Sequence, residues 1–328
     1  MVSRLRIRGR GKPYDCIMGL SGGVDSSYLA LLAVRRFKLR PLVVHVDAGW
    51  NSEVAVGNIQ RIVHELRLDL HTKVIDWTEM RELQRAYLLA GVANQDVPQD
   101  HAFFAALYSE ARAFGICDIL TGGNLQSESI LPTAWGHDAM DSVNLLAIHS
   151  AFGRTPLKQY PIHGNWHRLF YKRFVRKMNT HRPLDLMHYN KFEAKEQLKR
   201  EVGWRDYGGK HYESIFTKFF QAHYLPARFG YDKRLAHLSS LIVSGQIDRD
   251  EALEQLKAPL YRSDELEQDL QFVIKKLDLT REEFDRLMNE QPRSYREFRN
   301  SDWLVDLLRV AFKGMSFVSR TFRGSGRK

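Results

Sequence analysis

A seven-residue loop between an apolar run and a helical pattern constrains this chain most. The apolar run ends at Leu20, the loop reads S-G-G-V-D-S-S over residues 21–27, and helically spaced apolar residues continue to residue 37. Adjacent glycines let a backbone approach a ligand closely, and a helix N-terminus supplies N–H groups with positive partial charge. The sequence therefore predicts a phosphate-binding turn between a strand and a helix.

The loop is not of the Walker type, which requires G-x-x-x-x-G-K-[ST]. It contains no lysine, so none of its side chains reaches for a γ-phosphate in the Walker manner. The S-G-G-x-D-S form resembles the pyrophosphate loop, or PP-loop, of the N-type ATP pyrophosphatases, which split ATP into AMP and pyrophosphate. An ordinary glycine-rich turn is the alternative interpretation.

Strand and helix patterns alternate through the first 120 residues. Apolar runs predict strands at residues 14–20, 41–47, 70–75 and 116–120, and amphipathic patterns predict helices at residues 25–37, 51–66, 78–90 and 98–114. Continuous apolar runs suit parallel strands that are buried on both faces, joined by right-handed βαβ units. We expect an α/β fold with a doubly wound, mainly parallel sheet and a mostly helical C-terminal region.

The length of 328 residues suffices for one large domain or two ordinary ones. We predict a basic segment (1–13), a PP-loop ATP-binding domain (14–185), a helical substrate or partner region (186–312) and a basic tail (313–328). Beyond residue 136 we expect helices at residues 137–148, 189–202 and 216–224 and from Asp248 onward, with an extended stretch at residues 182–184.

The net charge of +10 is concentrated at the two ends of the chain. Residues 1–13 and residues 313–328 each carry five lysines or arginines and no acid, so the body between them is formally neutral. A neutral body argues against a nucleic-acid partner. The two cysteines form no C-x-x-C, and no apolar run is long enough to span a membrane. We expect a cytoplasmic protein whose basic tails are suited to peripheral contact with the inner face of the inner membrane.

Three polar segments follow predicted strands, at the edge where doubly wound sheets bind ligands. Besides the loop they are the segment after residue 45 and the sequence T-G-G-N at residues 121–124. Val46 and Asp47 are candidates for contact with the adenosine, although Asp47 also suits a strand-end turn. We assign ATP binding to Ser21, Gly22, Gly23, Asp25, Ser26, Ser27, Val46, Asp47, Gly122, Gly123, Asn124 and Arg234.

Cations in the second half of the chain suit adenylyl transfer, which builds negative charge on the α-phosphate and on pyrophosphate. The pair Lys210 and His211 follows two glycines, and Lys218 and Lys233 come later. A solvated basic surface is the alternative. The residues to which we assign catalysis are Asp25, Lys210, His211, Lys218 and Lys233.

The segment from residue 121 to Glu128 resembles an element of NAD synthetases in which a glutamate binds magnesium near the phosphates. This chain has one residue more between Asn124 and Ser127. The resemblance implies that Glu128 and Asp25 are Mg²⁺ ligands, and a glutamate that interacts with a helix dipole is the alternative. For His137 and Asp141 we favour hydrogen bonding over metal binding.

Residues 14 to about 257 resemble the N-acetyl sugar amidotransferase family of bacterial surface-polysaccharide and flagellin-glycan pathways. The carrying segments are residues 14–17, 21–27, 45–53, 98–101 (P-Q-D-H), 121–124, 208–214 (G-G-K-H-Y-E-S), 216–221 and 232–237. Relatives often carry a cysteine-bearing N-terminal segment, which the sequence printed above lacks.

The resemblance implies that an acetamido group on a sugar nucleotide becomes an acetamidino group. In that reaction the amide oxygen attacks ATP, pyrophosphate leaves, and ammonia displaces AMP, with Mg²⁺ bound to ATP. No glutaminase nucleophile is present in the sequence. We therefore expect a glutaminase partner like that of histidine synthesis to supply ammonia, together with a cyclase-like subunit.

Two other classes of function stay open at this point. A tRNA-modifying ATP pyrophosphatase such as a lysidine synthetase shares the loop, but it would need a basic RNA-binding face. A nucleotide-binding protein that docks to membranes is suggested by apolar residues within 303–312 and the basic tail that follows.

Overall fold

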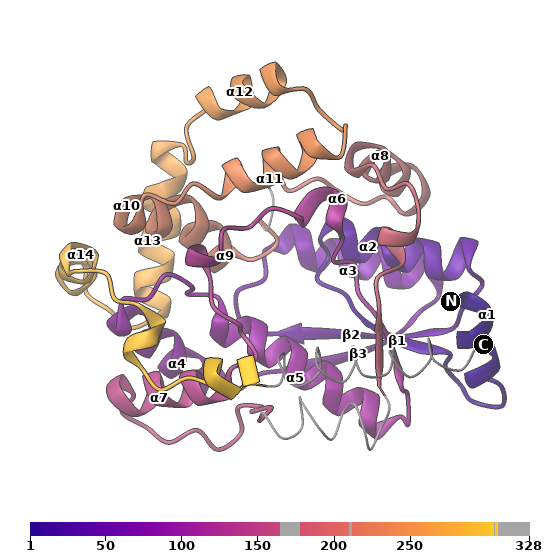
Figure 1. The fold of residues 1–328 in the computed structure, drawn as a ribbon, viewed down its shortest axis with the longest axis horizontal. Coiled ribbons are helices and arrows are strands. Elements are labelled where there is room, and N and C mark those ends of the chain that lie inside the picture. The colour runs from indigo at the N-terminus through magenta and orange to yellow at the C-terminus, as the bar shows by residue number, and fades with distance from the viewer. Residues whose placement is uncertain (165–177, 210–211, 305, 308–328) are drawn as a thin grey trace, which may run out of the picture.

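The computed structural model describes residues 1–164, 178–209, 212–304 and 306–307, and its centre is a parallel sheet of five strands (Figure 1). The strands are β1 (Cys16–Gly19), β2 (Pro41–Asp47), β3 (Asp69–Val74), β4 (Asp118–Leu120) and β5 (Asn179–His181). Their order in the sheet is β3-β2-β1-β4-β5, and every pairing is parallel. The predicted α/β fold is confirmed.

Helices cover both faces of the sheet, because successive strand residues point to opposite sides. Ile17 belongs to a buried cluster with side chains of α4 (Trp77–Ala90), α5 (Val97–Ala113) and α7 (Ser142–Phe152). Cys16 and Met18 belong to another cluster with side chains of α2 (Val24–Leu31), α3 (Glu53–Leu66) and α8 (Lys191–Val202). Figure 1 shows these two groups of helices on opposite sides of the strands. The sheet is therefore doubly wound.

The helices predicted at residues 25–37, 51–66, 78–90 and 98–114 are present, whereas α1 and α6 were not predicted. The helical elements of the first half are α1 (Val2–Arg8), α2 (Val24–Leu31), a π-helical turn (Leu32–Arg36), α3 (Glu53–Leu66), α4 (Trp77–Ala90), α5 (Val97–Ala113), α6 (Leu125–Glu128), a 3₁₀ turn (Thr133–Trp135) and α7 (Ser142–Phe152). Ser52 caps α3, since its hydroxyl accepts a hydrogen bond from the Ala55 N–H at 3.2 Å.

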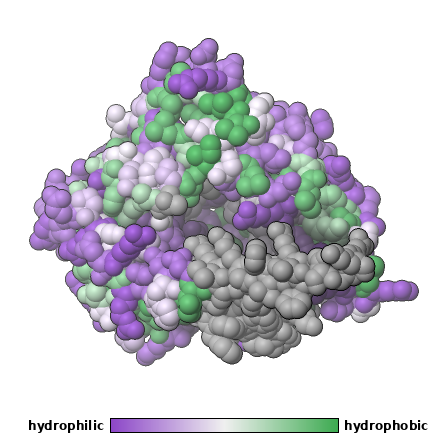
Figure 2. Space-filling view, in the orientation of Figure 1, coloured by the Kyte–Doolittle hydropathy of each residue, from purple (hydrophilic) through white to green (hydrophobic). Residues whose placement is uncertain are grey.

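The described C-terminal region is mostly helical, as expected. Its elements are a 3₁₀ turn (Pro183–Leu186), α8 (Lys191–Val202), α9 (Ile215–Phe219), a π-helical turn (Phe220–Tyr224), α10 (Leu225–Phe229), α11 (Lys233–Val243), α12 (Arg249–Lys257), α13 (Ser263–Lys276), α14 (Arg281–Asn289) and a 3₁₀ turn (Tyr295–Glu297). Apolar side chains gather over α11 and α12 in Figure 2, where Leu235, Val243 and Leu253 are exposed.

Three further details differ from the sequence prediction. The helix expected from residue 137 begins at Ser142, because the Asp141 carboxylate accepts hydrogen bonds from the Val143 and Asn144 N–H groups and so caps the helix. The three-residue strand β5 was not predicted, and Pro183 begins a 3₁₀ turn instead of continuing an extended stretch. The proposed domain boundaries stay predictions.

Over the part of the chain described by the structure, we find no helix with the length and apolar content needed to cross a bilayer.

Candidate functional site

A cavity of about 1190 Å³ lies at the carboxyl edge of the sheet. Its walls come from the ends of β1, β2 and β4, from the start of α5, and from the C-terminal region. The three polar segments that the sequence placed at strand ends all contribute to it, as the topology of a parallel sheet requires.

The loop over residues 21–27 requires glycine at position 22 and leaves little room for a side chain at position 23. Gly22 has a φ of +80°, and a Cβ atom there would lie 2.5 Å from the Ala55 carbonyl oxygen. A Cβ atom on Gly23 would lie 3.1 Å from the Ser21 hydroxyl and from a Glu213 carboxylate oxygen. The backbone geometry therefore excludes a Cβ atom at position 22, and a Cβ atom at position 23 would require its neighbours to shift.

The loop is also held in shape before any ligand binds. The Gly23 N–H donates to the Ser21 hydroxyl at 3.2 Å, and the Ser26 hydroxyl donates to the Gly23 carbonyl at 3.2 Å. The Trp204 indole N–H donates to the Gly22 carbonyl at 2.9 Å. Gly23 is the N-cap of α2 and offers no capping side chain, which leaves this helix N-terminus suited to an anion.

Ser27, the last residue of the loop, is fully buried and does not line the cavity. Its hydroxyl has no hydrogen-bond partner among the described residues.

Asp25 and Glu128, the proposed magnesium ligands, both line the cavity. The Tyr189 hydroxyl donates to the Asp25 carboxylate, and the Asn124 amide donates to the same oxygen at 3.4 Å. Burial, followed by the charge of Asp25, raises the pKa of Tyr189 far above its usual value, so this hydroxyl remains a donor. Two carboxylates in one cavity are donors of the kind that Mg²⁺ prefers.

The T-G-G-N segment, residues 121–124, contacts Asp25 and also caps the helix that carries Glu128. Asn124 caps α6, which carries Glu128, by accepting a hydrogen bond from the Ser127 N–H at 2.8 Å. A Cβ atom on Gly122 would lie 2.8 Å from the Asp25 carbonyl carbon, so only glycine lets the end of β4 approach α2 this closely. Gly122 and Gly123 line the cavity, whereas Asn124 does not.

At the end of β2 the two candidates have different positions. Val46 lines the cavity, and Asp47 does not. The Asp47 carboxylate accepts hydrogen bonds from the Gly49 N–H at 2.8 Å and from the Asn51 amide at 3.1 Å. In this structure Asp47 has the turn role that the sequence left as its alternative.

The predicted cations also differ in position. Lys233, the first residue of α11, lines the cavity. Lys218 does not, because its ammonium group forms ion pairs with Asp269 at 2.9 Å and Glu265 at 3.2 Å.

Arg234 likewise does not line the cavity, and it pairs with Asp232 at 2.8 Å. Lys210 and His211 lie outside the described residues, so their predicted roles stay predictions.

Several cavity residues had no assigned role in the sequence analysis. Asp96 and Asp100 come from the start of α5, and Tyr207 and Glu213 come from the segment beside the loop. The Tyr207 hydroxyl accepts a hydrogen bond from the Val24 N–H at 3.2 Å. Asp100 belongs to the P-Q-D-H segment on which the family resemblance partly rests, and this motif is the sequence signal that could have pointed to Asp100.

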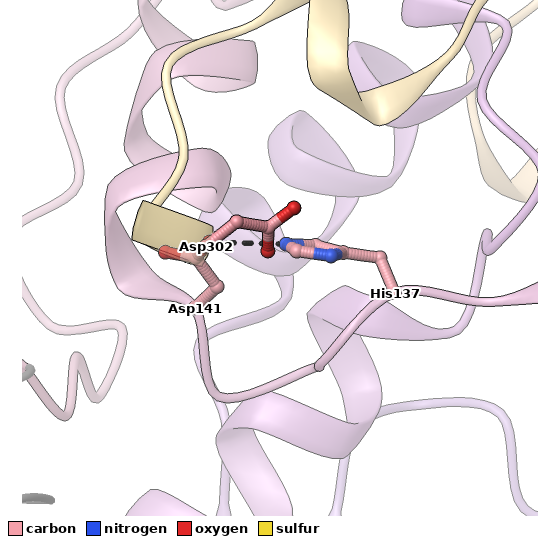
Figure 3. Close-up of side chains that lie close together, drawn as sticks. All are labelled: His137, Asp141 and Asp302. Atoms are coloured by element: carbon pink, nitrogen blue, oxygen red, sulfur yellow. Dashed lines mark hydrogen bonds and ion pairs between the residues drawn. The ribbon is translucent and has the colours of Figure 1, made fainter. Parts of the chain in front are cut away.

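His137, Asp141 and Asp302 meet at one wall of the cavity (Figure 3). His137 Nε2 lies 3.0 Å from Asp141, whose carboxylate also accepts the Ser301 N–H at 2.8 Å. Burial would raise the pKa of Asp141, but the hydrogen bonds from His137 and the backbone outweigh it and lower the pKa to about 2. Asp141 thus caps α7 and also binds the backbone of Ser301 in the C-terminal segment, so we interpret the role of the cluster as structural.

Together, the fold and the site define an α/β protein with a preformed glycine loop at a helix N-terminus and two carboxylates in one large cavity. The family model described as "LPS biosynthesis protein WbpG-like, C-terminal domain" matches residues 213–310. This match supports the resemblance to surface-polysaccharide amidotransferases.

A curated relative is the uncharacterized protein MJ1599 of Methanocaldococcus jannaschii, which is 33% identical over 76 residues. The match covers 23% of this chain and 27% of that protein, so the chain spans about a quarter of the relative's length.

Among solved structures, the NH3-dependent NAD synthetase of Campylobacter jejuni has 12% identity and a TM-score of 0.36, over 77% of this chain and 93% of that one. The glutamine-dependent NAD+ synthetase of Acinetobacter baumannii has 15% identity and a TM-score of 0.34, over 91% of this chain and 47% of that one. TM-scores this low do not establish a shared fold, and the topology described above stands on its own geometry.

Proposed function

We propose that this protein is an ATP-dependent, AMP-forming amidotransferase of lipopolysaccharide biosynthesis. Its acceptor is a nucleotide-linked N-acetyl sugar, and its product is the corresponding acetamidino sugar. The observation that carries the proposal is the lysine-free glycine loop, preformed at the N-terminus of α2 and opening into the same cavity as Asp25 and Glu128. The match of residues 213–310 to the WbpG-like domain supports the choice of pathway.

The size of the cavity supports a reaction between two large ligands. Sites for one small molecule or cofactor are roughly 300–1,000 Å³ in volume, whereas this cavity measures about 1190 Å³. The loop and the ends of β2 and β4 form one part of its wall, and residues 131–141 together with residues from the C-terminal segment form another. ATP would bind at the former, and the sugar nucleotide would extend toward the latter.

The proposed chemistry overcomes the poor reactivity of an amide. The acetamido oxygen attacks the α-phosphorus of ATP, and the leaving pyrophosphate is received by the N–H groups at the start of α2. Lys233 supplies positive charge from the wall of the cavity. Bound Mg²⁺, held by Asp25 and Glu128, would neutralise charge on the phosphates.

Ammonia completes the reaction by displacing AMP from the activated carbon. It must arrive neutral and shielded from water, so we propose that a glutaminase subunit related to that of histidine synthesis delivers it, with a cyclase-like subunit beside it. The sequence itself contains no glutaminase nucleophile.

The test incubates the purified protein with ATP, Mg²⁺, an ammonium salt and a panel of UDP- and CMP-linked N-acetyl sugars, and then follows nucleotides and sugars by mass spectrometry. We expect AMP, pyrophosphate and one amidine product whose mass is about 1 Da below that of its acceptor, since NH replaces O. Formation of ADP as the only nucleotide product would refute the proposal. Turnover with glutamine alone would contradict the need for a partner.

A further inference from the structure

Asp100 occupies a position from which it can exchange a proton with a ligand in the cavity. Helix α5 leads into the parallel strand β4, so its first turn lies at the carboxyl edge of the sheet. Asp96, the N-cap of α5, and Asp100, one turn later, both line the cavity. Two carboxylates separated by one helical turn lie on the same face of the helix.

The two carboxylates have different surroundings. Asp96 accepts hydrogen bonds from the Gln99 amide at 3.0 Å and from the Thr217 hydroxyl at 3.1 Å. The Asp100 carboxylate accepts no hydrogen bond from the residues that the structure describes. A pair of acids in unequal surroundings is the arrangement that separates acid and base roles in enzymes.

The groups around Asp100 set its ionisation near neutral pH. Burial contributes most and the negative charge of Asp96 adds to it, while Lys233 opposes both, and the pKa of Asp100 rises to about 7. Among the described residues, the buried Tyr160 also interacts with Asp100; its hydroxyl donates to the Pro98 carbonyl at 2.6 Å, and burial raises its pKa well above the usual value, so it stays protonated. At neutral pH, Asp100 can therefore both accept and donate a proton.

We propose that Asp100 is a catalytic residue that removes the N–H proton of the acceptor's acetamido group and later returns it. This assignment rests on the proposed function. While the amide oxygen bonds to the α-phosphorus and the bond from that phosphorus to pyrophosphate breaks, the N–H proton passes to Asp100 and a C=N bond forms. When ammonia adds to the carbon, the C=N electron pair takes the proton back from Asp100.

The rest of the reaction needs no further acid or base from the protein. The C–O bond to AMP breaks, and its electron pair leaves with AMP. One proton of the former ammonia passes to solvent or to pyrophosphate, and the amidine keeps the others as a cation. Asp100 ends as the carboxylate with which it began.

The first experiment measures ionisation without turnover. Aspartate carboxyl carbons are labelled with ¹³C, and their NMR shifts are followed between pH 4 and pH 9 in the wild type, Asp100→Asn and Asp250→Asn. Asp250 lies in the first turn of α12 and is exposed, which makes it a matched control. We expect one carboxyl that titrates near pH 7, absent from Asp100→Asn and present in Asp250→Asn. If no carboxyl titrates there, the assignment of Asp100 is wrong.

The second experiment measures turnover with the ammonium salt and the acceptor identified above. We expect Asp100→Asn to lower the rate of AMP formation by roughly 10²- to 10⁴-fold and to remove the acid limb of the pH profile of kcat/KM, with ATP binding and thermal stability retained. An unchanged rate and pH profile in this variant would overturn the inference. A wild type that forms no AMP with any acceptor would instead refute the proposed function, whatever the NMR titration shows.

Discussion

The carboxylate of Glu79 offers the sharpest test of how this structure is held together. It is almost fully buried at the start of α4, and it accepts hydrogen bonds from the backbone N–H groups of Lys158 at 2.8 Å, Gln159 at 2.9 Å and Tyr160 at 2.6 Å. The anchored segment packs on α5 through the Tyr160 hydroxyl, which donates to the Pro98 carbonyl. Glu79 thus attaches this loop to α4, and Tyr160 attaches the same loop to α5, the helix that carries Asp100.

The substitution Glu79→Gln keeps the volume and removes the charge. The amide NH₂ of the new glutamine replaces one carboxylate oxygen, which in the wild type accepts two backbone N–H groups. The charge-assisted hydrogen bonds are lost, and the buried backbone N–H groups then lie against the N–H donors of the amide. At about 1–3 kcal/mol for each buried donor left unsatisfied, we expect a loss of about 2–4 kcal/mol in the free energy of unfolding. With roughly 2 cal/mol/K of unfolding entropy per residue, a chain of this length should lose about 3–6 °C in Tm.

The pH dependence of this loss follows from the pKa of Glu79. Burial would raise it, but the three backbone hydrogen bonds outweigh burial and hold the pKa below the usual 4.5. A carboxylate with a lowered folded-state pKa stabilises the protein above its unfolded pKa, and this stability is lost as the pH falls through the folded pKa. The difference between wild type and variant should therefore be full at pH 7 and shrink on acidification below pH 4.5.

The assay is urea unfolding of both proteins at pH 7 and at steps down to pH 3.5, with Glu65→Gln as the control. Glu65 is exposed on α3, so its replacement should change stability by less than about 0.5 kcal/mol. Equal stability of Glu79→Gln and wild type at pH 7 would refute the role assigned to these hydrogen bonds. A difference that stays constant down to pH 3.5 would refute the role of the charge.

Three further predictions concern the cavity. Asp25→Asn should abolish AMP release with any ammonia source, which nucleotide chromatography would detect, and normal release would remove Asp25 from the mechanism. Gly22→Ala should weaken ATP binding by at least about tenfold in calorimetry, because its φ of +80° and the 2.5 Å approach to Ala55 exclude a Cβ atom; unchanged affinity would mean that the loop tolerates other shapes. Lys233→Met should lower the rate of AMP formation far more than Lys218→Met, since of these two lysines Lys233 lines the cavity. Lys218→Met should cost at most about 1 kcal/mol of stability, because its ion pairs with Glu265 and Asp269 are partly exposed to solvent. The reverse order of rates would restore the catalytic role predicted for Lys218.

Much of the fold was predictable because its signals are local. The continuous apolar run of β2, the serine that caps α3 and the capping box at Thr280 each lie within a few residues. The strand β5 was missed because three residues carry too short a pattern, and it exists only because β4 offers a parallel edge. The start of α7 was misplaced because the sequence does not reveal that Asp141 caps it.

The site shows the same division between local and distant causes. Ser21, Gly22, Gly23 and Asp25 follow one another in the chain, and a strand followed by a helix needs a turn of this kind at that point. The roles of cations are set by distant partners. The sequence does not distinguish the surroundings of Lys218 from those of Lys233. In the structure, Lys218 forms ion pairs with Glu265 and Asp269 of α13 and does not line the cavity.

By itself, the sequence determined the parallel α/β order, the glycine loop and the lack of a Walker lysine, because these depend on residue type and short spacing. Only the tertiary structure decided that Asp100, Asp96 and Lys233 line the same cavity, and that His137, Asp141 and Asp302 lie close together. Burial and the field of neighbouring charges depend on which distant segments pack together, and these two effects turn an ordinary carboxyl into one that exchanges protons at neutral pH.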